Sequence, residues 1–175
     1  MGLQIRLRSA RLVSHQRFKM NIFVLDTDPA TAARMHLDKH VVKMPLETAQ
    51  MLCTINAGYD IPVPYKPTHK NHPCTVWANA SRANYQWLVE LGLNLCKEYT
   101  YRYKKVHACQ KIIESLAACP PQITCDTPTA FAQAMPVDCH KDDAVQAYHY
   151  YYKQYKSHIA KWTGRPVPTF MGVAA

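Results

Sequence analysis

The sequence predicts a mainly α protein: a compact single-domain helical bundle with a kinked first long helix and two long Pro-rich loops. Its 175 residues, of which 48% are hydrophobic, are enough for one domain with a core of its own. Apolar side chains recur at helical spacing over several segments, which two proline-rich stretches, residues 56–73 and 119–139, separate. No repeat or change in composition indicates a second domain, so we expect one α-helical domain over residues 20–171.

The first 19 residues differ in composition from the rest of the chain. They contain five Lys or Arg and no acidic residue, and they lack the apolar core of a signal peptide. Organelle transit peptides are also Arg-rich and poor in acids, but we interpret residues 1–19 as a basic N-terminal extension, either flexible or produced by an upstream start codon. Met20 then opens the domain with the sequence MNIFVLD, in which the apolar run 21–25 is expected to be a strand or extended.

The first long helix is predicted to run from Pro29 to about Cys53. Asp28 is a favourable N-cap, and Pro29 suits the first helical position, where its missing N–H costs no hydrogen bond. Pro45 lies inside this helix, which predicts a kink near residues 41–43. Three further helices are expected, from Pro73 to near Lys104, from His107 to Ala118, and from Asp142 to about Trp162.

Ionisable side chains gather on one face of the first predicted helix, and apolar residues surround them. Because buried charges are costly unless they are paired or used, we interpret this polar stripe as a candidate catalytic site. Repulsion between its lysines, together with desolvation, would lower a lysine pKa, and a lowered pKa makes an amine nucleophilic. The alternative is a Lys43–Glu47 ion pair with two satisfied histidines. The polar stripe consists of His36, Lys39, His40, Lys43, Glu47 and Gln50.

Two further regions are candidates for binding nucleic acid. The loop before Pro73 combines lysines, a threonine and histidines with a helix N-terminus, whose N–H groups bind phosphate; the alternative is an ordinary solvated loop. Tyrosines alternate with Lys and Arg in residues 99–105 and 148–156, which is typical of surfaces that stack on bases, although about half of these tyrosines must face the core. The predicted nucleic-acid-binding residues are Lys66, His69, Lys70, Asn71, His72, Trp77, Tyr101 and Arg102.

The composition argues against several classes of protein. The seven cysteines form no CxxC pair, so we expect reduced thiols in a cytoplasm and no disulfide framework. No Walker loop, dinucleotide fingerprint or apolar run of transmembrane length is present. His36 and His40 have a spacing that can chelate zinc, but without an HExxH motif we expect no metal and no other cofactor. The net charge of +9 favours double-stranded DNA as the partner; the alternative is a merely soluble basic protein. We expect a monomer that does not bind membranes.

Several segments carry a resemblance to known proteins. Residues 20–52 and the motif YKPTHKNHPCTVW at residues 65–77 resemble small phage-encoded proteins, most of them without an assigned function. More distantly, His36-Leu37, Pro45 and the aromatic-basic segment 150–162 resemble the phage pyrimidine-dimer DNA glycosylase/AP lyase family of the endonuclease V type. That resemblance implies a small, basic, all-α enzyme in the cytoplasm of a phage-infected bacterial host. It also implies an enzyme that kinks the damaged duplex, flips out a base, and attacks the sugar C1′ with an amine to form a Schiff base.

The resemblance further implies a glutamate on the first helix and an N-terminal amine as nucleophile. The family's glutamate position falls on Lys43 in this sequence, so Glu47, one turn later, is expected to substitute for it. If translation starts at Met20, removal of that methionine exposes the amine of Asn21. Otherwise the amine of Lys43 supplies the nucleophile internally.

We therefore predict a DNA-binding enzyme that acts on a damaged or modified base by DNA glycosylase/AP-lyase chemistry. Lys43 or the N-terminal amine attacks C1′, Glu47 stabilises the sugar cation and assists proton transfer, and His36 and His40 tune or relay protons. Trp77 or a tyrosine stacks on the extruded base. Two alternatives remain: an enzyme acting on a nucleotide or small phosphate, with a metal on His36 and His40, and a non-catalytic phage protein that binds a host factor.

Overall fold

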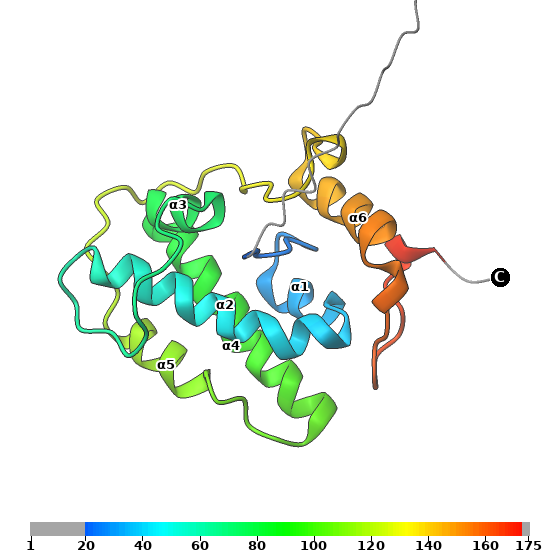
Figure 1. Ribbon diagram of the computed structural model, residues 1–175, viewed down its shortest axis with the longest axis horizontal. Helices are drawn as coiled ribbons and strands as arrows, with labels where there is room; N and C mark the ends of the chain where they lie inside the picture. Colours follow the sequence, from blue (N-terminus) through cyan, green and yellow to red (C-terminus); the bar gives the residue numbers. More distant parts are fainter. Residues whose placement is uncertain (1–19, 173–175) are drawn as a thin grey trace, which may run out of the picture.

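The computed structural model describes residues 20–172, and within them the chain is helical, without a β-strand (Figure 1). This confirms the predicted mainly α class, whereas the extension predicted for residues 1–19 lies outside the described residues. None of the helices described is both long and apolar enough to cross a membrane. The α-helices are α1 (Pro29–Met35), α2 (Asp38–Ala57), α3 (Pro73–Ala80), α4 (Arg82–Tyr103), α5 (Gln110–Ala118) and α6 (Ala144–Tyr155), with 3₁₀ turns η1 (Val137–Cys139), η2 (Ser157–Ile159) and η3 (Thr169–Met171).

The first predicted helix is divided into two. Residues 36–37 have extended backbones, with ψ angles of 135° and 158°, and they separate α1 from α2. The C-terminal part of the chain stabilises this break. The Asp38 N–H donates to the Lys161 carbonyl (2.8 Å), and the Trp162 indole N–H donates to the Met35 carbonyl (2.8 Å). Backbone groups that a broken helix would leave unpaired are therefore satisfied by a distant segment.

Pro45 does not end the helix in which it lies. Residues 41–43, where the kink was predicted, are helical, and α2 continues through Pro45 to Ala57. The interruption in this part of the chain is instead at residues 36–37. As a consequence, the N-terminal end of the predicted polar stripe does not lie on the same helix as the rest.

The second and last predicted helices are shorter than expected. The helix expected from Pro73 to Lys104 is divided at Ser81, whose φ of −152° and ψ of 159° are extended. The Ser81 hydroxyl accepts the N–H of Asn84 and so caps the start of α4. The last helix, α6, ends at Tyr155, and the 3₁₀ turn η2 follows it.

Residues 21–25, predicted as a strand or extended run, form with Met20 a buried segment without a β-strand, in which Phe23 has a positive φ. Figure 1 shows this segment between α2 and α6, and hydrogen bonds hold it on both sides. The Asn21 N–H donates to Glu47 on α2 (2.8 Å), and the His149 ring on α6 lies 2.8 Å from the Leu25 carbonyl. This segment therefore places the start of the described chain directly beside α2.

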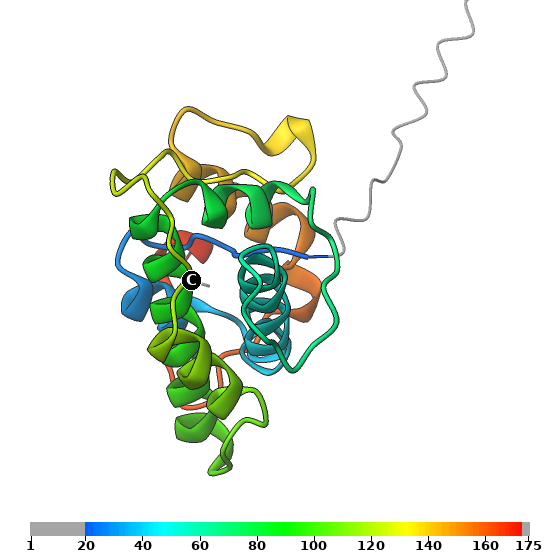
Figure 2. The ribbon, with the colours of Figure 1, turned by 90° about the vertical axis from the view of Figure 1, so that its left-hand side faces the viewer.

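The helix α4 lies at the centre of the remaining helices, because it contacts α1, α2, α3 and α5. Figure 2 shows α2 and α4 packed beside each other. They are in close contact at Gly92, where an added Cβ would lie 2.6 Å from the Thr48 side chain on α2. The long loop after α5 then crosses over α3 and leads to α6 (Figure 1).

Candidate active site around Glu47

Glu47 lies on α2 where residues 20–25 cross this helix. It is only 4% exposed, and its carboxylate has two polar partners inside the protein. The Asn21 backbone N–H donates to Oε2 (2.8 Å), and the Lys43 ammonium lies 2.6 Å from Oε1. Burial raises the pKa of Glu47, while the Lys43 ammonium and the Asn21 N–H act in the opposite direction. A carboxylate with a raised pKa accepts a proton more readily than an exposed one, which suits a general base.

The Asn21 side chain fixes the position of its own backbone. Its Oδ1 accepts the N–H groups of Ile22 (2.8 Å) and Phe23 (3.0 Å), and its Nδ2 donates to the Ala134 carbonyl (2.8 Å). This local turn carries Phe23 into the left-handed region, with a φ of 39° that a bulky residue rarely adopts. The backbone nitrogen of Asn21 is thus held against Glu47 by its own side chain and by a distant loop.

His40 closes the same site on the side of α6. Its Nδ1 lies 2.6 Å from the Tyr152 hydroxyl, and its ring is stacked on Phe23 with 4.2 Å between centroids. Burial lowers the pKa of His40 to about 2, and the nearby charges of Lys156 and Lys43 act in the same direction. His40 is therefore a neutral imidazole at physiological pH, suited to hydrogen bonding and not to acting as a cation.

The structure brings only part of the polar stripe together. Lys43 and Glu47 are in contact, while His36 is completely buried in the break between α1 and α2, where its ring packs against those of Phe23 (6.1 Å) and His40 (6.4 Å). Its Nδ1 lies 2.7 Å from the Ala32 carbonyl, its Nε2 has no partner, and burial lowers its pKa to about 4. Lys39 is exposed on α2, one turn before Lys43. Within residues 20–172, no group of three or more His, Cys, Asp or Glu side chains is placed to hold a metal ion.

Lys156, just after α6, is a site residue that the sequence reasoning did not single out. Its Nζ lies 5.9 Å from the centroid of the Phe23 ring and 5.1 Å from that of Tyr151. Burial lowers the pKa of Lys156, Lys43 lowers it further, and Glu47 acts in the opposite direction. The only signal in the sequence was the aromatic-basic run 148–156, which predicted a surface and no particular residue.

The loop before α3 lies against α2 beyond Glu47. The Thr54 hydroxyl accepts the Thr68 N–H (3.0 Å), and the charge of His69 lowers the pKa of Glu47. Thr54 follows Glu47 by two helical turns, a rise of about 10 Å. Four predicted nucleic-acid-binding residues are exposed on this loop, and His72 instead caps α3 by accepting the Cys74 N–H (3.2 Å). The four exposed residues are Lys66, His69, Lys70 and Asn71.

Trp77 lies away from solvent. It is 6% exposed and packs against the rings of Trp87 and Phe131, at centroid distances of 5.7 and 5.2 Å. A base cannot stack on a ring whose faces are already covered by protein. We therefore interpret Trp77 as a core residue and not as the predicted stacking platform.

Tyr101 and Arg102 lie at the C-terminal end of α4, where they contact the C-terminal segment. The Arg102 side chain is buried and forms ion pairs with Glu98 (2.8 Å) and Asp38 (2.9 Å). Tyr101 donates to the Gly164 carbonyl (3.0 Å) and remains 44% exposed. Because its guanidinium is fully engaged inside the protein, Arg102 holds helices together and is not free to contact phosphate.

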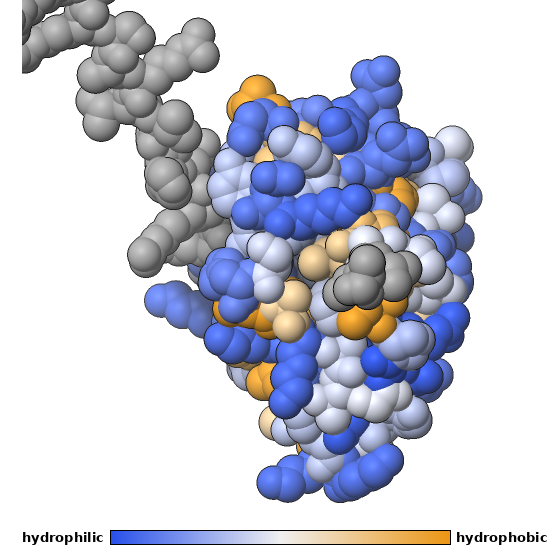
Figure 3. Space-filling view, turned by 90° about the vertical axis from the view of Figure 1, so that its right-hand side faces the viewer, coloured by the Kyte–Doolittle hydropathy of each residue, from blue (hydrophilic) through white to orange (hydrophobic). Residues whose placement is uncertain are grey.

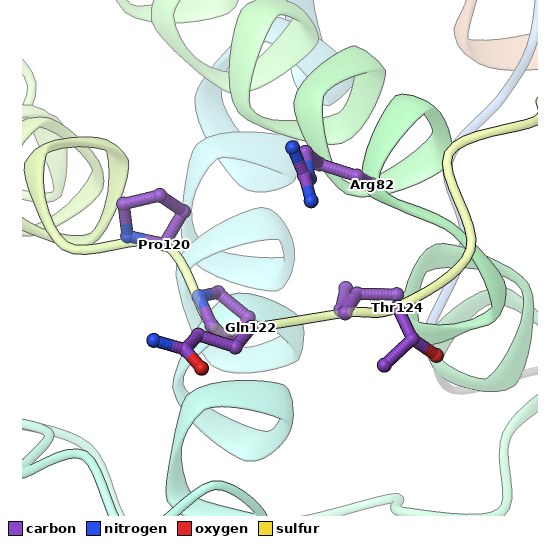
Figure 4. Close-up of a pocket in the computed structure, with 6 residues that line it drawn as sticks. Arg82, Pro120, Gln122 and Thr124 are labelled. Atoms are coloured by element: carbon purple, nitrogen blue, oxygen red, sulfur yellow. The ribbon is translucent and has the colours of Figure 1, made fainter.

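A cavity of about 480 Å³ lies apart from this cluster, between the start of α4 and the loop after α5 (Figure 4). Arg82 faces it from α4, and Gln122 and Thr124 line it from the loop. The Arg82 guanidinium pairs with Asp126 (3.1 Å), and both side chains are exposed. Neither Lys43 nor Glu47 lines this cavity.

Comparison with known proteins gives one match. The family model described as pyrimidine dimer DNA glycosylase matches residues 20–111, a range that begins at Met20 and ends in α5. Searches of curated proteins and of solved structures found no match. The matched range covers more than half of the chain and includes both Asn21 and Glu47. The chain therefore belongs to the pyrimidine dimer DNA glycosylase family, a family of DNA-repair glycosylases.

Proposed function

We propose that this protein is a DNA glycosylase with AP-lyase activity, in which the α-amine of Asn21 attacks the sugar C1′ of a damaged or modified nucleotide. The observation that carries the proposal is the 2.8 Å hydrogen bond between the Asn21 backbone nitrogen and the buried Glu47 carboxylate. When Asn21 is the first residue of the chain, this nitrogen is a primary amine beside a general base. The functional domain then lies within residues 20–171.

The acid–base properties of amines favour the α-amine over Lys43. An unperturbed α-amino group has a pKa of about 7.8, and a lysine side chain one of about 10.4. At pH 7 roughly one in seven α-amines is neutral, against roughly one lysine in 2,500. In addition, the Lys43 ammonium is already paired with Glu47 at 2.6 Å, and its side chain is 61% exposed. A protonated amine has no lone pair with which to attack, so Lys43 is better suited to orient Glu47.

The proposed reaction follows from these positions. As the nitrogen of Asn21 bonds to C1′, the bond from C1′ to the base breaks, its electron pair goes to the base nitrogen, and Glu47 accepts a proton from the attacking amine. As the sugar ring opens, Glu47 gives this proton to the ring oxygen O4′, which leaves a protonated Schiff base and an ionised Glu47. Glu47 then removes a proton from C2′, the C3′–O bond breaks, and the 3′ phosphate leaves with that electron pair. His40, held by Tyr152, packs on Phe23 and keeps the turn at residues 21–23 in place.

The charge distribution supports double-stranded DNA as the substrate. The whole chain has a net charge of +9, of which five positive charges precede Met20, and Lys66, His69, Lys70 and Asn71 are exposed on the loop that contacts α2 at Thr54. Lysines and backbone N–H groups at such positions contact phosphates and set the register of a duplex. We propose that this loop holds the backbone beside the reacting nucleotide, and that a monomer acts in the cytoplasm of a phage-infected bacterium.

Borohydride trapping tests the nucleophile directly. The protein is produced with Asn21 as its first residue, released from a cleavable tag and checked by mass spectrometry. It is incubated with duplex DNA that contains an abasic site or ultraviolet damage, and then reduced. We expect a covalent adduct whose peptide map places the sugar on the α-amine of Asn21. The matched control retains Met20, which moves the primary amine by about 3.8 Å, one residue along the chain, and it is expected to lose most of the adduct.

The variant Lys43→Met separates the two candidate amines. If the α-amine is the nucleophile, this variant still forms the adduct, at a reduced rate because Glu47 has lost its ion-pair partner. An adduct that disappears in Lys43→Met but persists in the protein that retains Met20 would assign the nucleophile to Lys43. No adduct with either DNA, from protein shown to be folded, would rule out the lyase reaction.

A further inference from the structure

Lys156 carries a positive charge without an acidic partner beside the proposed active site. Its ammonium lies over the rings of Phe23 and Tyr151, at 5.9 and 5.1 Å from their centroids. Ring faces attract a cation but do not neutralise it. Among the ion pairs of residues 20–172, none involves Lys156. The ammonium is therefore held in place while its charge remains available to an anion.

The two rings beneath this ammonium belong to a set of three stacked rings. Phe23 lies nearly parallel to His40, with 4.2 Å between centroids and 17° between planes, and nearly parallel to Tyr151, at 6.2 Å and 11°. We call Phe23, His40 and Tyr151 the aromatic shelf. Its members come from residues 20–25, α2 and α6, so the position of Lys156 depends on all three parts of the fold. Burial of the shelf leaves Lys156 little freedom to move away from Glu47.

Lys156 and the reacting groups share one site. The charges of Lys43 and Glu47 both act on Lys156, and Lys156 in turn acts on His40. Lys43 is neutralised by Glu47 at 2.6 Å, whereas Lys156 is not neutralised. The side of the molecule that carries α6 is mostly hydrophilic, with only small apolar patches, so a polyanionic strand can approach it (Figure 3). The site thus presents one uncompensated positive charge next to the carboxylate and the amine.

We propose that Lys156 binds the phosphate that leaves C3′ in the lyase step, and that it accelerates this step more than formation of the Schiff base. This inference rests on the proposed function. It adds a binding group from the part of the chain after α5, beyond the residues that the family model matches.

Lys156 favours the lyase step over Schiff-base formation because negative charge develops on the phosphate only in the lyase step. In β-elimination, Glu47 takes the C2′ proton, the C3′–O bond breaks, and its electron pair passes to the phosphate oxygen. The phosphodiester, with one negative charge, becomes a phosphomonoester whose second ionisation has a pKa of about 6, so its charge approaches −2. A fixed cation that touches this oxygen stabilises the transition state of elimination. Attack of the amine on C1′ leaves the charge of the phosphate unchanged, so Lys156 contributes little to that step.

Single-turnover kinetics on an abasic duplex, with enzyme in excess and saturating, separates the two steps. One set of samples is quenched with borohydride to count Schiff base, and a parallel set is analysed for cleaved strand. For Lys156→Met we expect Schiff-base formation within about threefold of wild type and strand cleavage slowed by about 10- to 100-fold, less than the loss of a fully enclosed donor. Lys156→Arg, which keeps the charge, is expected to recover most of the cleavage rate.

Lys141→Met is the matched control, because Lys141 also lies over a tyrosine ring, that of Tyr150, at 4.8 Å. It removes the same charge and the same kind of contact away from Glu47, and we expect both rates to stay near wild type. Equal slowing of both steps in Lys156→Met, or no slowing of cleavage, would overturn the inference. Lys156→Gln takes its place if the methionine variant does not fold. Absence of any adduct in the wild-type protein would instead refute the proposed function itself.

Discussion

Replacing Glu47 by Gln separates the chemical role of this side chain from its structural role. Gln has nearly the same shape, and its oxygen can still accept the Asn21 N–H that lies 2.8 Å from the carboxylate. The variant loses the ion pair with Lys43, whose side chain is 61% exposed. Ion pairs this exposed contribute about 0–1 kcal/mol, because water and salt screen them. We therefore expect the free energy of unfolding at neutral pH to change by no more than about 1 kcal/mol.

The pH dependence of unfolding shows whether ionisation of Glu47 stabilises or destabilises the fold. Because burial raises the pKa of Glu47 in the folded state, protonated Glu47 favours folding. The stability that it contributes is fully present below the unfolded pKa and is lost as pH rises through the raised folded pKa. Gln does not ionise, so the variant is expected to gain stability relative to wild type as pH rises above the unfolded pKa of Glu, about 4.3, and through the raised folded pKa. Thermal unfolding across this range measures the difference.

The catalytic rates of Glu47→Gln, in contrast to its stability, should fall strongly. Loss of the general base is expected to slow Schiff-base formation and strand cleavage by roughly 10²- to 10⁴-fold. Both rates are measured in single turnover with an abasic duplex, using protein that begins at Asn21. A Gln variant that keeps more than about a tenth of the wild-type rates would refute the role of Glu47 as general base. A fall in Tm of more than about 8 °C, where 1 kcal/mol corresponds to about 2–4 °C, would show that the charge is structural instead.

Three other predictions concern the scaffold. Burial lowers the pKa of His36 to about 4 and that of His40 to about 2. The free energy of unfolding is therefore highest above about pH 6.5, where both imidazoles are neutral in the unfolded chain as well. Below pH 6.5 it falls by up to about 1.4 kcal/mol per pH unit for each histidine, until the pH reaches the folded pKa. Urea unfolding at several pH values checks this, and a flat profile below pH 6.5 would contradict it. Gly92→Ala places a Cβ 2.6 Å from the Thr48 side chain and should destabilise the packing of α2 on α4 by about 1–3 kcal/mol; unchanged stability would mean that Thr48 moves freely. Arg102→Met removes the buried cation between Glu98 and Asp38, which keep Arg165 and Thr163 as partners, and should cost about 1–3 kcal/mol in denaturant unfolding without changing the salt dependence of DNA binding. A weaker salt dependence of DNA binding in this variant, with unchanged stability, would show instead that Arg102 contacts DNA.

Local signals in the sequence predicted where the first and last helices begin. Asp28 accepts the Thr31 N–H (2.8 Å) and caps α1 at the proline that was predicted to begin it, and Asp143 caps α6 in the same way. The contact between Lys43 and Glu47 also follows from helical spacing, because side chains four residues apart are neighbours on a helix. These features depend on residues close in sequence, which is why composition and spacing are sufficient to predict them.

The features that a sequence pattern could not supply depend on distant parts of the chain. The break at residues 36–37 is stabilised by hydrogen bonds from Lys161 and Trp162, and nothing between Pro29 and Cys53 indicates it. Without the break, His36 was predicted to share a face with Glu47, whereas the structure buries it against the end of α1. The position of Lys156 likewise requires α6 to fold back beside residues 20–25, which periodicity within α6 cannot reveal.

The side chain that reaches the Asn21 nitrogen is Glu47. It lies one turn of helix, or about 5.4 Å, beyond Lys43, the position on which the resemblance places the family's glutamate. What the proposed chemistry requires is a buried carboxylate in contact with the amine, not a particular position in the helix. Residues 20–25 cross α2 at Glu47, where the carboxylate side chain is 5% exposed, and the Lys43 side chain one turn earlier is 61% exposed. The proposed reaction therefore uses the buried acid at position 47, with the more exposed cation at position 43 paired to it.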